Sequence, residues 1–302
     1  MSRSHHDIYR ANCRPLRVIP TGERPILTDL PGIAAVLFDV YGTMFISGSG
    51  DIGAAQESGE ASALAAAFAA SGYQGHLEAE CGIECMLATI LAHHESLRAR
   101  GFEYPEVNIV DVWSECLDEM KQRGWMDPAG SSIDVRQLAI EYEVRANPTW
   151  PMPGLLECLA QLRAAGLTLG IISNAQFFTL EMFPGLLGQT VDDLGFVPEL
   201  QYYSFRHHRA KPDMFLYELA SKALAKRGIL AEKVIYVGND MLNDVQAARS
   251  VGFRTALFAG DRRSLRWRTG DPRVQGVQPD VVLTDLESLG KCISSTIPSP
   301  AD

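Results

Sequence analysis

Short apolar runs alternate with amphipathic segments over the second half of the chain. Apolar runs of about four to eight residues bounded by Gly, Pro or Asn predict buried strands, and apolar residues three and four apart predict helices. Strands that alternate with helices form a parallel sheet, so we expect an α/β fold with a doubly wound, Rossmann-like core. The predicted strands span 34–39, 167–172, 200–205, 233–237, 254–258 and 280–283, and the predicted helices span 154–165, 177–187 with a break at Pro184, 212–227, 243–251 and 285–294.

The pattern changes to helical spacing between residues 60 and 145, where no convincing strand occurs. This segment predicts a smaller all-helical domain inserted after the first strand. A Gly- and Ser-rich stretch at 46–53 leads into it and suits either a hinge or an ordinary loop. A proline-rich stretch at 147–154 predicts a stiff connector back to the sheet. The four predicted helices span 61–70, 77–100, 105–123 and 134–145.

The domain organisation follows from these patterns. We expect an N-terminal extension at 1–33, a core formed by 34–46 and 151–295, a helical domain at 47–150, and a disordered tail at 296–302. Each residue that precedes a proline disfavours helix, and four such pairs predict that residues 1–32 form an irregular, extended strap. The amphipathic segment 77–100 packs either within the helical domain or against a second subunit, so a homodimer is one alternative.

Charge and cysteine content narrow the function. The 302 residues carry a net charge of −10, which argues against general binding to nucleic acid or to anionic membranes but leaves room for a small anionic substrate in a local pocket. The six cysteines are scattered, which suits reduced thiols and a cytoplasmic location. The N-terminus lacks the apolar core of a signal peptide, and the chain lacks an apolar run long enough to span a membrane.

Polar residues follow four of the predicted strands or lie shortly after them. In a parallel sheet these strand ends share one edge, so the side chains can meet in a single pocket. Each stretch alone suits a turn, a loop or a helix cap; the four together favour an active site. They are Asp39-Val40-Tyr41-Gly42-Thr43, Ser173-Asn174, Lys211-Pro212, and Gly238-Asn239-Asp240 with Asp244.

These four motifs, in this order, resemble the haloacid dehalogenase superfamily of hydrolases. The resemblance spans residues 34 to about 260 and implies that Asp39 is a nucleophile that forms a covalent intermediate. It implies that the inserted helices are a cap over the site. It assigns catalytic positions to Asp39, Tyr41, Ser173 and Lys211, and substrate binding to Thr43, Ser173, Asn174 and Lys211. It assigns Mg²⁺ binding to Asp39, Asp240, Asp244 and the Tyr41 carbonyl.

Two positions divide the branches of that superfamily. Its phosphatases usually carry an acid two residues after the nucleophile, where this chain has Tyr41, a poor proton shuttle at neutral pH. Asp-x-Tyr-Gly-Thr is similar to the metal-independent 2-haloacid dehalogenases. The pair Asp240 and Asp244 instead matches the phosphatases, although Asn239 competes with Asp240 for the first of these acids.

We therefore expect a Mg²⁺-dependent phosphatase acting on a small phosphorylated metabolite. The alternatives are a metal-independent 2-haloacid dehalogenase and a binding or regulatory protein with little turnover. A run of arginines, at 262, 263, 266 and 268, suits surface ion pairs better than a contact with a substrate anion.

Overall fold

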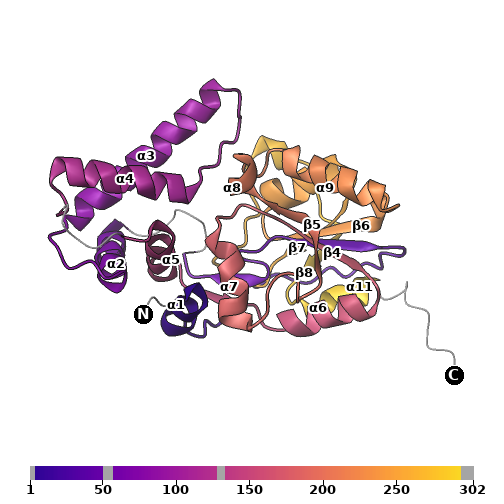
Figure 1. Cartoon of the computed structure of the whole chain (residues 1–302). Coiled ribbons are helices and arrows are strands. Elements are labelled where there is room, and N and C mark those ends of the chain that lie inside the picture. The colour runs from indigo at the N-terminus through magenta and orange to yellow at the C-terminus, as the bar shows by residue number, and fades with distance from the viewer. Residues whose placement is uncertain (1–3, 50–56, 128–132, 294–302) are drawn as a thin grey trace.

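The computed structural model describes residues 4–49, 57–127 and 133–293 (Figure 1). A six-stranded sheet in the order β5-β4-β1-β6-β7-β8 forms its core, and every neighbouring pair is parallel. The predicted Rossmann-like α/β core is confirmed, and the predicted tail at 296–302 lies outside the described residues. The strands are β1 (Ala35–Phe38), β4 (Thr168–Ser173), β5 (Phe196–Tyr203), β6 (Val234–Gly238), β7 (Arg254–Phe258) and β8 (Val281–Leu283).

The central strand β1 is buried on both faces. Val36 and Phe38 belong to one apolar cluster, and Ala35 and Leu37 to another, because successive side chains of a strand point to opposite faces. This double burial explains why β1 reads as a continuous apolar run. The first cluster includes side chains of α6 (Leu155–Ala164), α7 (Phe178–Leu187) and α11 (Glu287–Ile293), and the second those of α9 (Phe215–Lys226) and α10 (Ala247–Ser250).

Four helices, α2 to α5, lie to one side of the sheet (Figure 1) and come between two short strands along the chain. The strands β2 (Phe45–Ser47) and β3 (Thr149–Pro151) pair in antiparallel fashion where the helical segment leaves and rejoins the core. The predicted stiff connector thus contains a strand. Residues 50–53 of the predicted hinge lie outside the described residues. The helices are α2 (Glu57–Ala70), α3 (Ala79–Ala99), α4 (Ile109–Arg123) and α5 (Val135–Ala146).

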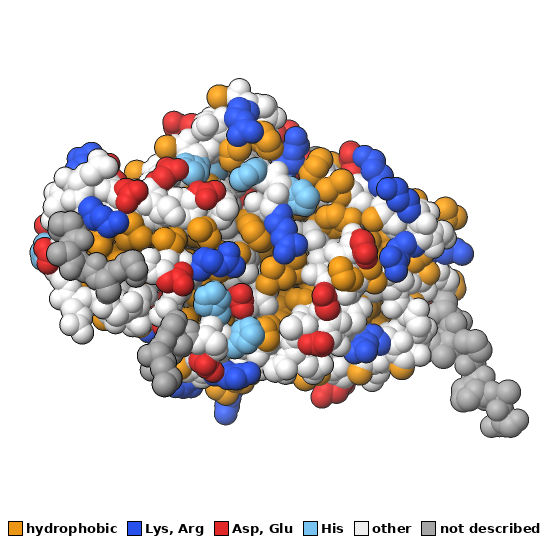
Figure 2. Space-filling view, in the orientation of Figure 1, with side chains coloured by type: hydrophobic (Ala, Val, Ile, Leu, Met, Phe, Trp, Pro, Cys, Tyr) orange, Lys and Arg blue, Asp and Glu red, His pale blue; other side chains and the backbone are white. Residues whose placement is uncertain are grey.

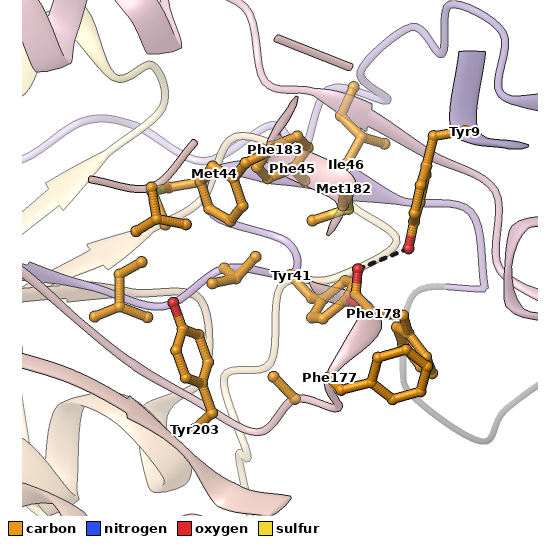
Figure 3. Packing of buried hydrophobic residues seen from close by; sticks show 14 of the residues in the cluster. Tyr9, Tyr41, Met44, Phe45, Ile46, Phe177, Phe178, Met182, Phe183 and Tyr203 are labelled. Carbon is orange, nitrogen blue, oxygen red and sulfur yellow. Dashed lines mark hydrogen bonds between the residues drawn. The ribbon is translucent and has the colours of Figure 1, made fainter. Parts of the chain in front are cut away.

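The expectation of an irregular N-terminus is wrong for residues 5–12, which form α1 (His5–Asn12). Its N-cap Ser4 accepts the N–H of Asp7, and tertiary packing then holds the short helix against α5 and α7. Tyr9 is buried and donates to the carbonyl of Phe178 at 3.0 Å (Figure 3). Further along, Ile26 exchanges two backbone hydrogen bonds with Val282, so this part of the strap runs along the outer edge of β8.

Four further predictions need correction. Helix α4 begins four residues later than predicted because the Asn108 side chain caps it. Helix α7 continues through Pro184, whose neighbours Met182 and Phe183 are held in the core. After β6 the chain does not enter an α-helix directly: Met241–Gln246 form a π-helix before α10. Strand β5 ends at Tyr203 and is followed by the short helix α8 (Ser204–His207).

Two surface properties bear on partners. No helix among the described residues is long and apolar enough to cross a bilayer. On the face in Figure 2, basic and acidic side chains are interspersed rather than gathered into a basic block, which accords with the net charge of −10. All six cysteines lie in described parts of the chain and are free thiols.

Candidate active site

Except for Lys211, which lies after β5 and α8, the predicted site residues lie at or after the ends of the strands β1, β4 and β6. β1 lies between β4 and β6, with Phe38 in register with Ile171 and with Val237. The backbone N–H of Asp39 still donates to the carbonyl of Val237, at 2.9 Å, so Asp39 is fixed as the first residue after β1. Strand ends of a parallel sheet share one edge, and the sheet therefore brings Asp39, Asn174 and Asn239 to the same place.

Lys211 connects two of the predicted carboxylates. Its Nζ lies 2.9 Å from Asp39 Oδ1 and 2.6 Å from Asp244 Oδ1, and all three side chains are buried. Burial lowers the pKa of Lys211, but the charges of Asp244 and Asp39 outweigh it and raise that pKa overall. The ammonium therefore stays charged and offsets the repulsion between the two carboxylates.

A buried tyrosine that the sequence did not suggest completes this group. Tyr236 lies on β6, and its hydroxyl donates to the carbonyl of Ile172 at 2.7 Å while it accepts from Lys211 Nζ at 3.1 Å.

Asp244 Oδ2 accepts the backbone N–H of Asp240 at 2.9 Å. A side chain at Gly238 would meet the Asp244 carboxylate at 2.4 Å, so this glycine is what lets Asp244 reach back to the strand end.

Asn239 and Asp240 point to different neighbours. Asn239 Oδ1 accepts from Thr43 Oγ1 at 3.1 Å, and its Nδ2 donates to the carbonyl of Ser264 at 2.6 Å. Asn239 is thus the member of the pair that contacts the turn after Asp39. Asp240 contacts Arg268, whose Nε lies 3.2 Å from Oδ1 and 3.0 Å from Oδ2.

The backbone also restrains the pair formed by Arg268 and Asp240. Asp240 Oδ1 accepts the N–H groups of Leu242 and Asn243, which caps the π-helix. Arg268 has a φ of 53°, a left-handed conformation that is uncommon for residues other than glycine. The expectation that the arginine run forms only surface pairs is wrong for both Arg263 and Arg268, because Arg263 pairs with the buried Asp261 and Arg268 with the buried Asp240.

The hydroxyl of Tyr41 is occupied elsewhere. Its oxygen lies 2.9 Å from Thr179 Oγ1, and Figure 3 shows the ring in one cluster with Phe177 and Phe178. Burial raises the pKa of Tyr41 well above its ordinary value, and the nearby Glu143 and Asp39 add to the rise. This phenol is therefore a still weaker acid than a free tyrosine. It agrees with the expectation that Tyr41 is a poor proton shuttle.

Asn174 and Ser173 differ in their access to the site. Asn174 exchanges two hydrogen bonds with the backbone of Lys211, at 2.6 and 3.2 Å, and thereby fixes the lysine-bearing loop. Ser173 is fully buried, and its hydroxyl donates to the carbonyl of Asn174 at 3.4 Å. Of Ser173 and Asn174, only Asn174 borders the cavity described next.

The site surrounds a small cavity of about 70 Å³. A larger cavity of about 690 Å³ lies beside Trp267, and neither Asp39 nor Lys211 lines it. This cavity is a weaker candidate for the active site because it lacks the predicted catalytic residues. The small cavity is lined by Asp39, Tyr41, Ser47, Asn174, Lys211, Asn239, Asp240, Asn243, Asp244, Ser264 and Arg266.

Comparison with known proteins identifies the family. Residues 33–252 match the model of the haloacid dehalogenase-like hydrolases. The chain belongs to this family. No curated protein matches the sequence. Among solved structures, a 2-haloacid dehalogenase from Pseudomonas syringae pv. Tomato DC3000 is 17% identical with a TM-score of 0.56 (87% of this chain, 99% of that one). A HAD phosphatase from Thermococcus onnurineus is 17% identical with a TM-score of 0.51 (88% and 100%). At this identity the two neighbours show the shared fold.

Members of the haloacid dehalogenase-like family include metal-dependent and metal-independent enzymes, so the fit of Mg²⁺ must be tested on this site. Carboxylate and amide oxygens are the ligands that Mg²⁺ prefers, and the cavity offers both kinds. Among the described residues, however, no three acidic, His or Cys side chains are arranged as a metal-binding group. Lys211 lies between Asp39 and Asp244, and Arg268 holds Asp240. The oxygen ligands of the site fit Mg²⁺, but in this structure the side chains of Lys211 and Arg268 are bound to the carboxylates.

Proposed function

We propose that this protein is a phosphatase that uses Asp39 as its nucleophile and acts, with Mg²⁺, on a small phosphorylated metabolite. The observation that carries the proposal is the meeting of three carboxylates, those of Asp39, Asp240 and Asp244, around one cavity beside a buried lysine. Replacing halide on carbon needs one nucleophilic carboxylate. Three carboxylates with amide oxygens suit a site that also receives a cation and a phosphate.

The chemistry of the proposal follows from Asp39. An aspartate is ionised at neutral pH, so it attacks phosphorus without a general base, forming an aspartyl phosphate as the bond to the leaving oxygen breaks. Water then cleaves the acyl phosphate, which releases inorganic phosphate and regenerates the carboxylate. Lys211, which holds Asp39 Oδ1, keeps the carboxylate oriented and offsets negative charge that arrives with the substrate.

Mg²⁺ would be held by Asp39, Asp240, Asp244 and the backbone carbonyl of Tyr41. When bound, it supplies positive charge that offsets the charge of the phosphoryl group. Because Arg268 holds Asp240, this ligand set is complete only after Arg268 releases the carboxylate.

The occupied phenol of Tyr41 limits the substrates that we expect. Without an acid two residues after Asp39, the leaving group must depart without strong protonation. We therefore propose aryl or acyl phosphates, whose leaving groups are weakly basic, over alkyl phosphates. The predicted domain boundaries place the core at 34–46 and 151–295 and the helical domain at 47–150. We propose that this helical domain, with α2 to α5, is a cap that selects the substrate. The pairing of β2 with β3 supports this division.

A second function is favoured by two observations. Tyr41 and the engagement of Asp240 by Arg268 both suit a metal-independent 2-haloacid dehalogenase, because displacement of halide needs neither a proton donor nor a metal. In that reaction Asp39 would attack carbon, halide would leave with the bonding electrons, and water would hydrolyse the resulting ester.

One experiment separates the two functions. The purified protein is incubated with a panel of phosphate esters and with 2-haloacids, each with Mg²⁺ and with a chelator, and phosphate and halide are measured. Phosphate release that disappears with the chelator supports the phosphatase. Halide release unaffected by the chelator supports the dehalogenase. Asp39→Asn should abolish turnover in either case, and no turnover on both panels would leave a binding or regulatory protein as the better account.

We also propose a cytoplasmic location, in keeping with six free thiols. A homodimer is a further proposal. Leu87 and Leu91, one helical turn apart on α3, are 47% and 59% exposed and would provide its surface. Light scattering on the purified protein measures the mass and decides between monomer and dimer.

A further inference from the structure

Ser264 carries a buried hydroxyl that has no hydrogen-bond partner. The residue is 2% exposed, and its Oγ is one of four such buried oxygens among the described residues. An unpaired buried hydroxyl destabilises the folded protein, so each case calls for a reason. The other three oxygens belong to Ser71, Glu141 and Thr149, none of which borders the cavity beside Asp39. Ser264 does border it.

The hydroxyl is held against the turn that follows Asp39. A side chain at Gly42 would meet Ser264 Cβ at 2.4 Å and Oγ at 2.9 Å, so Gly42 is what permits this close approach. Asn239 fixes the loop that carries Ser264, because its side-chain amide donates to the Ser264 carbonyl at 2.6 Å. The backbone N–H of Arg266 in turn donates to the Asn239 carbonyl at 2.9 Å.

This loop therefore adds two donors to the cavity that are absent from the four motifs. Ser264 contributes a hydroxyl, and Arg266 places a guanidinium-bearing side chain in the same lining as Asp39 and Lys211. A hydroxyl donor and a cation in the lining of the cavity that Asp39 borders, with Lys211 also there, suit a tetrahedral oxyanion with several acceptor oxygens.

We propose that Ser264 is a substrate-binding residue whose hydroxyl donates to an oxygen of the phosphoryl group positioned for attack by Asp39. The inference rests on the proposed phosphatase function and deepens it. The hydroxyl has no hydrogen-bond partner within the protein, and on this proposal its partner is the substrate. The energetic consequence is specific: removal of the hydroxyl weakens binding of the oxyanion without weakening the fold.

The contrasting account treats Ser264 as a packing residue beside Gly42. Ser264→Ala tests both accounts, because it removes the hydroxyl and keeps Cβ. Ser71→Ala is the matched control, since it also removes an unpaired buried hydroxyl but lies at the end of α2, outside the cavity lining. Both substitutions should leave the midpoint of thermal unfolding unchanged or slightly higher, because no hydrogen bond is lost.

The test measures binding of inorganic phosphate by calorimetry in the presence of Mg²⁺, together with thermal unfolding of each variant. We expect Ser264→Ala to weaken phosphate binding by about ten- to a hundredfold, the effect of one hydrogen bond to a charged group, and Ser71→Ala to leave it unchanged. Ser264→Gly, which also lacks the hydroxyl, serves if the alanine variant does not fold.

Equal phosphate affinity of wild type and Ser264→Ala would overturn the inference and leave the proposed phosphatase intact. Weaker binding together with an unfolding midpoint several degrees lower would assign Ser264 a structural role and also overturn it. If the wild-type protein binds no phosphate and hydrolyses no phosphate ester, the proposed function and the inference fall together.

Discussion

The guanidinium of Arg268 holds the carboxylate of Asp240 through two of its nitrogens, Nε and Nη2. Asp240 Oδ1 also accepts two backbone N–H groups, so this carboxylate is saturated with donors. A cation therefore already occupies the acid that we propose as a Mg²⁺ ligand. Binding of Mg²⁺ at the proposed site would be an exchange with Arg268.

Arg268→Gln should raise the affinity for Mg²⁺ by about tenfold, equivalent to roughly 1.4 kcal/mol, because the competing guanidinium is gone. Calorimetric titration of chelator-treated protein with Mg²⁺ measures this directly. Arg273→Gln is the matched control: Arg273 makes a similar two-nitrogen contact with Asp271, outside the catalytic cavity. An Arg268→Gln affinity no higher than that of wild type would contradict the exchange.

Tyr41→Phe should change turnover by no more than about threefold, because a phenol bonded to Thr179 and raised in pKa does not shuttle protons. The free energy of unfolding should fall by about 1 kcal/mol, since Thr179 Oγ1 loses its partner. Steady-state kinetics and urea unfolding provide the two measurements. Thr179→Val combined with Tyr41→Phe should cost less than the sum of the single variants. Loss of turnover at unchanged stability would instead make the phenol a catalytic group.

Lys211→Met should abolish measurable turnover and lower the free energy of unfolding by roughly 3 kcal/mol, because it leaves Asp39 and Asp244 buried without their counter-charge. Lys222→Met is the comparison. Its contact with Glu218 is 3.5 Å long and solvent-exposed, so its removal should cost less than about 0.5 kcal/mol. Chemical unfolding of both variants gives the difference, and similar costs would show that the buried network contributes no special stability.

Glu106 should make stability depend on pH. Burial raises its pKa to about 7 from an ordinary value of 4.5, although Ser204, Val107 and Gln176 donate to the carboxylate. Between these two pKa values the folded protein keeps a proton that the unfolded chain has released. The contribution of Glu106 to stability is therefore greatest at acidic pH and falls as pH rises toward about 7.

Glu106→Gln imitates the protonated side chain and should remove this part of the pH dependence. The variant should gain roughly 1 to 3 kcal/mol relative to wild type between about pH 5 and pH 8, measured by urea unfolding. Because the side chain joins the segment before α4 to Gln176 and Ser204, hydrogen exchange in these segments should follow the same trend. Glu143, whose pKa burial also raises to about 7, supplies the control variant Glu143→Gln for a site away from this contact. Parallel pH profiles for wild type and Glu106→Gln would contradict the prediction.

Much of the core and the approximate site were predictable from local patterns. The run that ends at Asp39 gave a doubly buried strand because a central parallel strand must be apolar on both faces. The carboxyl ends of β1, β4 and β6 then had to share an edge, which brought Asp39, Asn174 and Asn239 together. The convergence of Lys211 on Asp39 and Asp244 agrees with the order of the motifs, but the distances between these side chains depend on tertiary packing.

Other features escaped local patterns. Helix α1 forms because α5 and α7 bury Tyr9, a gain that propensity within residues 5–12 does not contain. In the sequence Tyr236 looks like one more apolar strand residue, and only the fold shows that its hydroxyl accepts a hydrogen bond from Lys211. The arginine run looks uniform in sequence, yet Arg263 pairs within its own loop while Arg268 reaches Asp240.

Hydrophobic periodicity and turn residues act over a few neighbouring positions, so they were enough to predict which segments are strands and which acids follow them. The partners of those acids depend on contacts between distant segments. Asn239 faces Thr43 while Asp240 faces Arg268, although the two are adjacent in the chain. That choice depends on how a loop more than twenty residues downstream returns to the strand end, and on Gly42 leaving room for Ser264. Contacts between distant segments carry no local signature, so the charge balance of this site is a property of the fold.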